Sequence, residues 1–206
     1  MATIKLYGTP LSGHAHRVEV LLRMLGIPYE YIESAAQRAS EDFGKLNPLR
    51  QIPVLADGGL VLSDSNAIMV YLVKRYGANT PWLSDDAVEA AQIQRWLSIA
   101  AGEVRHGPAS ARMSSLWNMK GEIAFARAHE IAEKLLTMMN AHLAGRDYLA
   151  TNHPTIADLA CYSYIAHAPE GRISLVPYPE VRAWLARIEA LPNFHPMPQS
   201  AIPAAA

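Results

Sequence analysis

The sequence predicts a two-domain protein: an α/β domain (residues 1–77), a short linker (78–86) and an all-helical domain (87–206). Two observations support this prediction. Up to Gly77, strand-like and helix-like segments follow the order β-α-β-α-β-β-α, which is typical of an α/β layer structure. Beyond the linker, helical patterns follow one another and no segment reads convincingly as a strand. A length of 206 residues accommodates two small domains.

The chain opens with a predicted strand–helix–strand unit. Residues 3–7 (TIKLY) are rich in β-branched and aromatic side chains, which favours a strand. A proline turn follows, and a helix is expected from Ser12 to Leu25, ended by Gly26. Its apolar residues recur at helical spacing: Val18, Leu21, Leu22 and Leu25. The segment YEYI (29–32) then predicts a second strand.

The rest of the first domain predicts a short helix, a hairpin and a longer helix. The short helix is expected around 40–46. Two apolar runs, 52–56 and 60–62, flank an Asp-Gly-Gly turn, which is a strong hairpin signal. A helix is expected over 65–76, with an inner face made of Ala67, Ile68, Tyr71 and Leu72.

The second domain is predicted to be a bundle of about five helices. Residues 77–86 (GANTPWLSDD) are rich in turn residues, as expected of a linker. Helical patterns then cover 87–112, 120–143, 155–167 and 178–190.

Composition excludes several classes of function. Lys and Arg total 18 against 19 Asp and Glu, and this near-neutral balance argues against nucleic-acid binding. The single cysteine, Cys161, cannot form an internal disulfide, a CxxC pair or a cysteine-rich zinc site. The absence of a signal core and of long apolar runs predicts a cytoplasmic protein that does not bind membranes.

Ser12 is the first candidate for chemistry, because it lies where the first strand passes into the first helix. Its ordinary role there is to cap the helix. The same helix end, however, has unpaired N–H groups and a positive dipole that favour an anion. A thiolate held there would accept the serine hydroxyl, and its pKa would fall below the usual value of about 8.5.

Two further pairs of residues carry a structural and a functional interpretation. Ile52-Pro53 opens a strand, but a cis bond there would leave the Ile52 backbone to pair with an extended peptide. Asp64-Ser65 is an ordinary helix cap, but it could also bind the two charges of an α-amino acid end group.

Five polar residues of this domain are expected on the solvated surface when no ligand is bound. Arg38 and Gln51 lie in loops before the short helix and before Ile52. His14, His16 and Arg17 follow Ser12 on the first helix, where one of them could line the mouth of a pocket. His14 and His16 do not share a helix face, so no metal site is expected.

Three blocks of sequence together resemble the cytosolic glutathione transferase family. They are YxxPxSG at 7–13, NPLRQIPVL at 47–55 and SDSNAIMxYL at 63–72. They run in order through the first domain with compatible spacing. The family usually has glycine where Arg50 stands and glutamate where Asp64 stands. A fourth segment, HPTIADLA (153–160), resembles the family's capping box, in which Thr155 and Asp158 cap a helix.

The resemblance implies a thioredoxin-like first domain that binds glutathione. Ser12 matches the catalytic serine of the serine-using classes (theta, phi and many bacterial members). Ile52, beside a cis Pro53, matches the residue whose backbone pairs with the cysteinyl part of glutathione. Asp64 and Ser65 match the pair that holds the γ-glutamyl end.

The resemblance leaves some positions open. Arg38 and Gln51 fall where the family often contacts the glycine end or the peptide backbone of glutathione. Other classes use a tyrosine at the end of the first strand, so Tyr7 is an alternative to Ser12. The run SGHAHRV favours Ser12, and Tyr7 is then a core residue.

In the family, the electrophile pocket is built mainly from the first helix of the helical domain. The matching stretch here carries Arg105, His106, Arg112 and Trp117, which could accept an anionic electrophile. These side chains could instead face solvent or a partner subunit.

The resemblance implies a homodimeric detoxification enzyme that conjugates glutathione, as cosubstrate and without a metal, to a small electrophile. Two alternatives stay open. One is a glutathione-dependent disulfide reductase or peroxidase. The other is a non-catalytic scaffold or regulatory protein with the same architecture.

Overall fold

A computed structural model describes residues 3–117 and 123–202. The chain divides into two compact units. The first consists of Met1–Leu83 and Pro192–Pro198, and the second of Ser84–Leu191 and Gln199–Ala206. The grouping of Pro192–Pro198 with the first unit differs from the expected division, which placed the whole of 87–206 in the helical domain.

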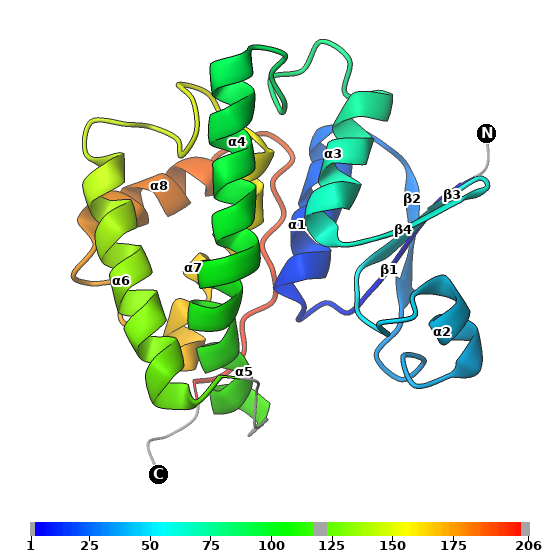
Figure 1. The fold of residues 1–206 in the computed structure, drawn as a ribbon, viewed down its shortest axis with the longest axis horizontal. Coiled ribbons are helices and arrows are strands. Elements are labelled where there is room, and N and C mark those ends of the chain that lie inside the picture. The colour runs from blue at the N-terminus through cyan, green and yellow to red at the C-terminus, as the bar shows by residue number, and fades with distance from the viewer. Residues whose placement is uncertain (1–2, 118–122, 203–206) are drawn as a thin grey trace. The chain divides into compact units, whose positions relative to one another are not determined.

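The first unit is a thioredoxin-like α/β domain around a four-stranded sheet (Figure 1). The strands lie in the order β2-β1-β3-β4, with β1 parallel to β2 and the other pairs antiparallel. This confirms the predicted order of elements. The elements are β1 (Ile4–Gly8), α1 (Gly13–Met24), β2 (Tyr29–Glu33), α2 (Glu41–Leu46), β3 (Val54–Asp57), β4 (Leu60–Ser63) and α3 (Ser65–Tyr76).

Helices α1 and α3 pack side by side against one face of this sheet (Figure 1). Gly8 permits the close approach of α1, since a Cβ at Gly8 would lie 2.7 Å from the Cβ of Ala15. Side chains alternate across a strand, so Tyr7 faces the opposite side of the sheet. There its ring meets that of Phe43 in α2 edge-to-face, with centroids 6.4 Å apart.

The β3–β4 hairpin turns through Gly58, whose φ of 59° is readily adopted by glycine. Helix α3 is tied to this hairpin, because the hydroxyls of Tyr71 and Tyr76 both donate to the Asp57 carboxylate. The expected inner face of α3 is partly wrong. Ala67 is exposed because it lies on the outer side of the first turn, whose residues Ser65 and Ile68 are buried. The buried residues of α3 are Ser65, Ile68, Met69, Leu72 and Val73.

Every regular element in the described part of the second unit is helical, which confirms the predicted all-α character. Its elements are α4 (Ala87–Ile99), η1 (Ala100–Ala109), α5 (Ser110–Trp117), α6 (Phe125–Leu143), α7 (Ile156–Ala166), η2 (Ala168–Gly171) and α8 (Pro179–Glu189). The first three residues of the helix expected over 120–143 lie outside the described ranges.

The helical pattern expected over 87–112 continues to Trp117, with a π-helical middle at η1. Pro108 lies inside this segment. Proline lacks the N–H of the α-helical ladder and clashes with the carbonyl four residues earlier, and a wider π turn relieves that clash.

Helix α7 is the central helix of the second unit. Every residue from Ile156 to Ile165 is buried, and the helix packs against α4, η1 and α8. Its start confirms the predicted capping box. The Thr155 hydroxyl accepts the Ala157 N–H at 3.2 Å, and the Asp158 carboxylate accepts the Thr155 N–H at 2.9 Å.

Among the described helices, none is long and apolar enough to cross a membrane.

Candidate functional site

The N-terminus of α1 presents the Ser12 hydroxyl. Ser12 has extended backbone angles (φ −88°, ψ 111°), and its Oγ accepts the Ala15 N–H at 3.3 Å. The capping role expected for Ser12 is therefore present. A hydroxyl can accept and donate at once, so this bond leaves the Ser12 proton available for an anion. The dipole of a helix of 12 residues favours a negative charge at that point.

A cis peptide bond joins Ile52 to Pro53, immediately before β3 begins at Val54. Pro53 is buried and Ile52 is half-buried. Gln51 is exposed, and its carbonyl accepts the side-chain amide of Asn47 at 2.8 Å. The backbone before β3 is thus held by a side chain from the end of α2.

Two arginines connect the loops on either side of α2 through hydrogen bonds. Arg38 donates from Nε to the Arg50 carbonyl, and Arg50 donates from Nη1 to the carbonyls of Arg38 and Ser40. Arg50 has a φ of 53°, in the left-handed region that glycine adopts most readily. This conformation gives a physical reason for the glycine that the family favours at this position.

The N-terminus of α3 presents Asp64 and Ser65. Asp64 has a φ of 75°, which is unusual for a residue other than glycine. Its Oδ1 accepts the N–H groups of Asn66 at 3.0 Å and Ala67 at 2.9 Å, which holds this backbone conformation. Both bonds converge on one oxygen, so the second oxygen of this exposed carboxylate can bind a cation. Ser65 is buried, with 4% of its surface exposed.

Arg17 brings a buried positive charge to the same helix end. Only 1% of its surface is exposed, and its Nη1 donates to Ser65 Oγ at 3.4 Å and to Asn66 Oδ1 at 3.2 Å. The expectation that Arg17 and His16 lie on solvated surface is wrong, since both are buried. The missed signal is helical phase, because Arg17 precedes the core residue Leu21 by one turn.

The residues proposed for an electrophile pocket lie on η1 and α5 of the second unit. Arg105 and His106 are half-buried on η1. Arg112 is buried and forms an ion pair with Glu170, and its guanidinium lies 5.3 Å from the ring centre of Trp117. Trp117 is 44% exposed. The geometry brings Arg112 and Trp117 together, while the charge of Arg112 is engaged by Glu170.

Burial alone would raise the pKa of Glu170, but three hydrogen bonds more than offset it and lower the pKa of this carboxyl. The donors are the Ser200 N–H, the ring of His167 and the guanidinium of Arg112. This cluster has a structural role, because the Glu170 carboxylate accepts hydrogen bonds from all three of these groups.

Within residues 3–117 and 123–202, no group of three or more His, Cys, Asp or Glu side chains is placed to hold a metal ion.

Two family descriptions match this chain. Residues 6–80 match the glutathione S-transferase N-terminal domain, and residues 99–192 match the glutathione S-transferase C-terminal domain. The chain is 33% identical to glutathione S-transferase 3 of Zea mays, over 94% of this chain and 92% of the maize protein.

Solved structures agree with this fold. The glutathione S-transferase of Pseudomonas fluorescens has a TM-score of 0.86 at 30% identity, covering 95% of this chain and 99% of that one. A glutathione transferase homologue of Drosophila mojavensis, solved with bound glutathione, has a TM-score of 0.84 at 29% identity, covering 93% of this chain and 90% of that one.

Proposed function

Because this chain belongs to the glutathione S-transferase family, we propose that it conjugates glutathione to a small electrophile and that the Ser12 hydroxyl stabilises the thiolate. One observation carries the proposal: Ser12 Oγ lies at the N-terminus of α1, where it accepts the Ala15 N–H and keeps its own proton for donation. In the reaction, the sulfur forms a bond to an electrophilic carbon, whose leaving group departs with the electron pair. The thiol proton is lost to solvent before the attack.

The Ser12 hydroxyl acts on the ionised form of the thiol. A hydrogen bond to the thiolate and the positive end of the α1 dipole both favour the charged state, so the pKa of the thiol falls below about 8.5. A larger thiolate fraction at neutral pH raises the rate of attack. The same bond holds the sulfur at a fixed point, which lowers the entropic cost of reaction.

The orientation of Tyr7 supports Ser12 as the hydroxyl that meets the sulfur. Tyr7 lies on the face of the sheet opposite α1, and its ring packs on Phe43. Ser12 lies at the start of α1, where the anion-binding N–H groups are. We therefore assign Tyr7 a packing role.

The N-terminus of α3 suits the γ-glutamyl end of glutathione. We propose that the N–H and hydroxyl of Ser65 bind the α-carboxylate, and that the second oxygen of Asp64 binds the ammonium. Arg17 supports this end as a positioning residue, because it fixes Ser65 and places a positive charge beneath the helix end.

Other contacts rest on the family resemblance. The Ile52 backbone, beside Pro53, is proposed to pair with the cysteinyl part of glutathione. Arg38 and Gln51 are proposed to meet its backbone or glycine end. Residues of the helical unit are proposed to contact the electrophile: Arg105, His106, Arg112 and Trp117. Homodimerisation stays a prediction, for which light scattering after size-exclusion chromatography is the test.

Calorimetric titration with glutathione, followed by assays with aryl halides, epoxides, hydroperoxides and mixed disulfides, tests the proposal. Saturable binding with turnover of a carbon electrophile supports it. Binding with turnover of hydroperoxides or disulfides alone would replace conjugation by peroxidase or reductase chemistry. Binding without turnover of any class would indicate a scaffold, and no binding would remove the functional assignment altogether.

A further inference from the structure

A second pocket, of about 160 Å³, lies within the first unit beside α1, β2 and the segment Pro192–Pro198. Its polar lining consists of His16, Glu19, Tyr31 and His195, and its apolar lining of Pro10, Pro196 and Pro198. None of these residues belongs to the proposed glutathione site. The pocket is therefore distinct from the proposed glutathione site.

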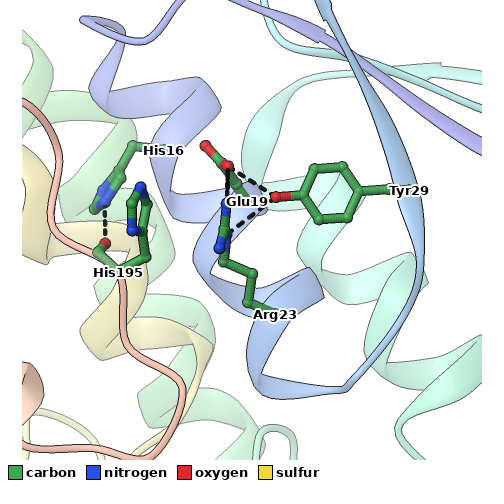
Figure 2. A network of polar contacts seen from close by, with 5 residues as sticks. All are labelled: His16, Glu19, Arg23, Tyr29 and His195. Atoms are coloured by element: carbon green, nitrogen blue, oxygen red, sulfur yellow. Dashed lines mark hydrogen bonds and ion pairs between the residues drawn. The ribbon is translucent and has the colours of Figure 1, made fainter.

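Glu19 supplies a carboxylate that is only partly used. One of its oxygens accepts the Tyr29 hydroxyl at 2.7 Å and the Arg23 Nη2–H at 3.0 Å. Figure 2 shows the second oxygen pointing away from both donors. The side chain is 15% exposed, so its charge is poorly screened by water. Glu19 thus offers a fixed anionic acceptor, oriented by two neighbours.

Tyr31 also lines the pocket, and its hydroxyl is near enough to Glu19 to be affected by the charge of that carboxylate. Burial raises the pKa of Tyr31, and the negative charges of Glu19 and Glu33 raise it further. The hydroxyl is therefore protonated at physiological pH, with lone pairs that can accept a hydrogen bond.

The segment Pro192–Pro198 closes this pocket through a hydrogen bond to α1. The ring Nε2 of His16 lies 2.7 Å from the His195 carbonyl oxygen (Figure 2). A carbonyl oxygen can only accept a hydrogen bond, so Nε2 of His16 carries the proton and donates it. This bond fixes His195 and the two prolines that follow it. The three proline rings offer carbon surface without donors.

We propose that this pocket binds a small organic ammonium ion, with its nitrogen at the free oxygen of Glu19 and the Tyr31 hydroxyl and its carbon body against the prolines. The size fits a single ring, since an apolar cavity of about 150 Å³ holds benzene in another protein. A carboxylate ligand is repelled by Glu19. A neutral ring forgoes the charge-assisted hydrogen bond, which is about twice as strong as a neutral one.

Benzylamine and benzyl alcohol are matched probes, because they differ chiefly in the charged nitrogen. Two-dimensional NMR of the full chain at neutral pH should show saturable shifts at Glu19, Tyr31 and His195 with benzylamine. Benzyl alcohol should bind at least roughly tenfold more weakly, as loss of a charge-assisted bond implies.

Glu19→Gln should weaken benzylamine binding by a similar factor while preserving an acceptor for Tyr29 and Arg23. The control is Glu30→Gln, which removes the same charge from β2. Its side chain points to the opposite face from Tyr31, and its partner Lys5 is a surface contact at 3.7 Å, so binding should be unchanged. Circular dichroism verifies the fold of each variant.

Tyr31→Phe is a second, milder variant, and it should weaken benzylamine binding several-fold. The proposal is overturned if the amine and the alcohol bind equally, if neither binds, or if folded Glu19→Gln binds benzylamine as the unaltered protein does. Glutathione binding is measured in the same samples. Its presence or absence bears on the proposed function alone.

Discussion

Arg38 and Arg50 exchange hydrogen bonds across the loops that flank α2: each guanidinium donates to the carbonyl of the other residue, at 3.0 and 3.1 Å. The exchange fixes the loop that leads to Ile52. It also holds Arg50 at a positive φ, so side-chain bonds offset a backbone cost of about 1–2 kcal/mol.

A pair of substitutions separates these two effects. Arg50→Ala keeps the strained backbone and loses the guanidinium bonds, whereas Arg50→Gly loses the bonds and relieves the strain. We expect the glycine variant to melt roughly 2–4 °C above the alanine variant. Thermal unfolding followed by circular dichroism measures this difference. Equal midpoints would show that the positive φ carries no cost.

Arg17 should affect glutathione binding more than turnover. Arg17→Lys should lose the bonds to Ser65 and Asn66, because both come from Nη1 and the lysine nitrogen is one bond closer to the backbone. We expect KM for glutathione to rise roughly tenfold with a smaller change in kcat. Initial rates at varied glutathione test this. The control is Arg23→Lys on the same helix, which should leave KM unchanged; equal effects would contradict the positioning role.

Asp158 should be essential to the stability of the helical unit. Its carboxylate accepts the N–H groups of Leu149 and Thr155 and the indole N–H of Trp184, each at 2.9 Å. The side-chain NH2 group of an asparagine would face at least one of these N–H groups, so that two donors would meet. Asp158→Asn should therefore cost about 2–4 kcal/mol in the free energy of unfolding. Urea denaturation gives the value.

The matched control for Asp158 is a surface aspartate. Asp147→Asn should cost less than about 1 kcal/mol, because Asp147 pairs with Arg187 at an exposed position. A comparable cost for both substitutions would remove the special role of the buried carboxylate.

Glu170 should make stability depend on acid. Its pKa in the folded protein is lowered, so the stabilisation is present above the unfolded pKa of about 4.3 and is lost as the pH falls through the folded value. Glu170→Gln should therefore be less stable than the unaltered protein at pH 7. The gap should narrow below about pH 4. Urea unfolding from pH 7 to pH 3 follows it, and a constant gap would contradict the account.

The features predicted correctly from the sequence have local signals. The cap at Ser12, the Asp57-Gly58 turn and the Thr155–Asp158 box each depend on residues within a few positions of one another. The backbone preferences and hydrogen bonds of neighbouring residues determine these caps and turns, so a short stretch of sequence is enough to predict them. The cap at Asp64 was visible in the same way, although its positive φ was not.

The features that were missed depend on contacts far apart in the chain. The sequence interpretation places Arg17 on the surface, whereas helical phase places it on the buried face. His16 is hydrogen-bonded to the His195 carbonyl, 179 residues away, and no periodic pattern in the sequence predicts that contact. The same distance explains why the grouping of Pro192–Pro198 with the first unit could not be read from local composition.

The central claim, that the Ser12 hydroxyl stabilises the glutathione thiolate, is tested most directly by titrating the ultraviolet absorbance of the bound thiolate against pH. The protein itself, Ser12→Ala and Tyr7→Phe are compared, each saturated with glutathione. We expect the bound thiol to ionise below about pH 8.5 in the unaltered protein and in Tyr7→Phe, and to shift up toward that value in Ser12→Ala. An unchanged pKa of the bound thiol in Ser12→Ala, with a raised one in Tyr7→Phe, would contradict the assignment.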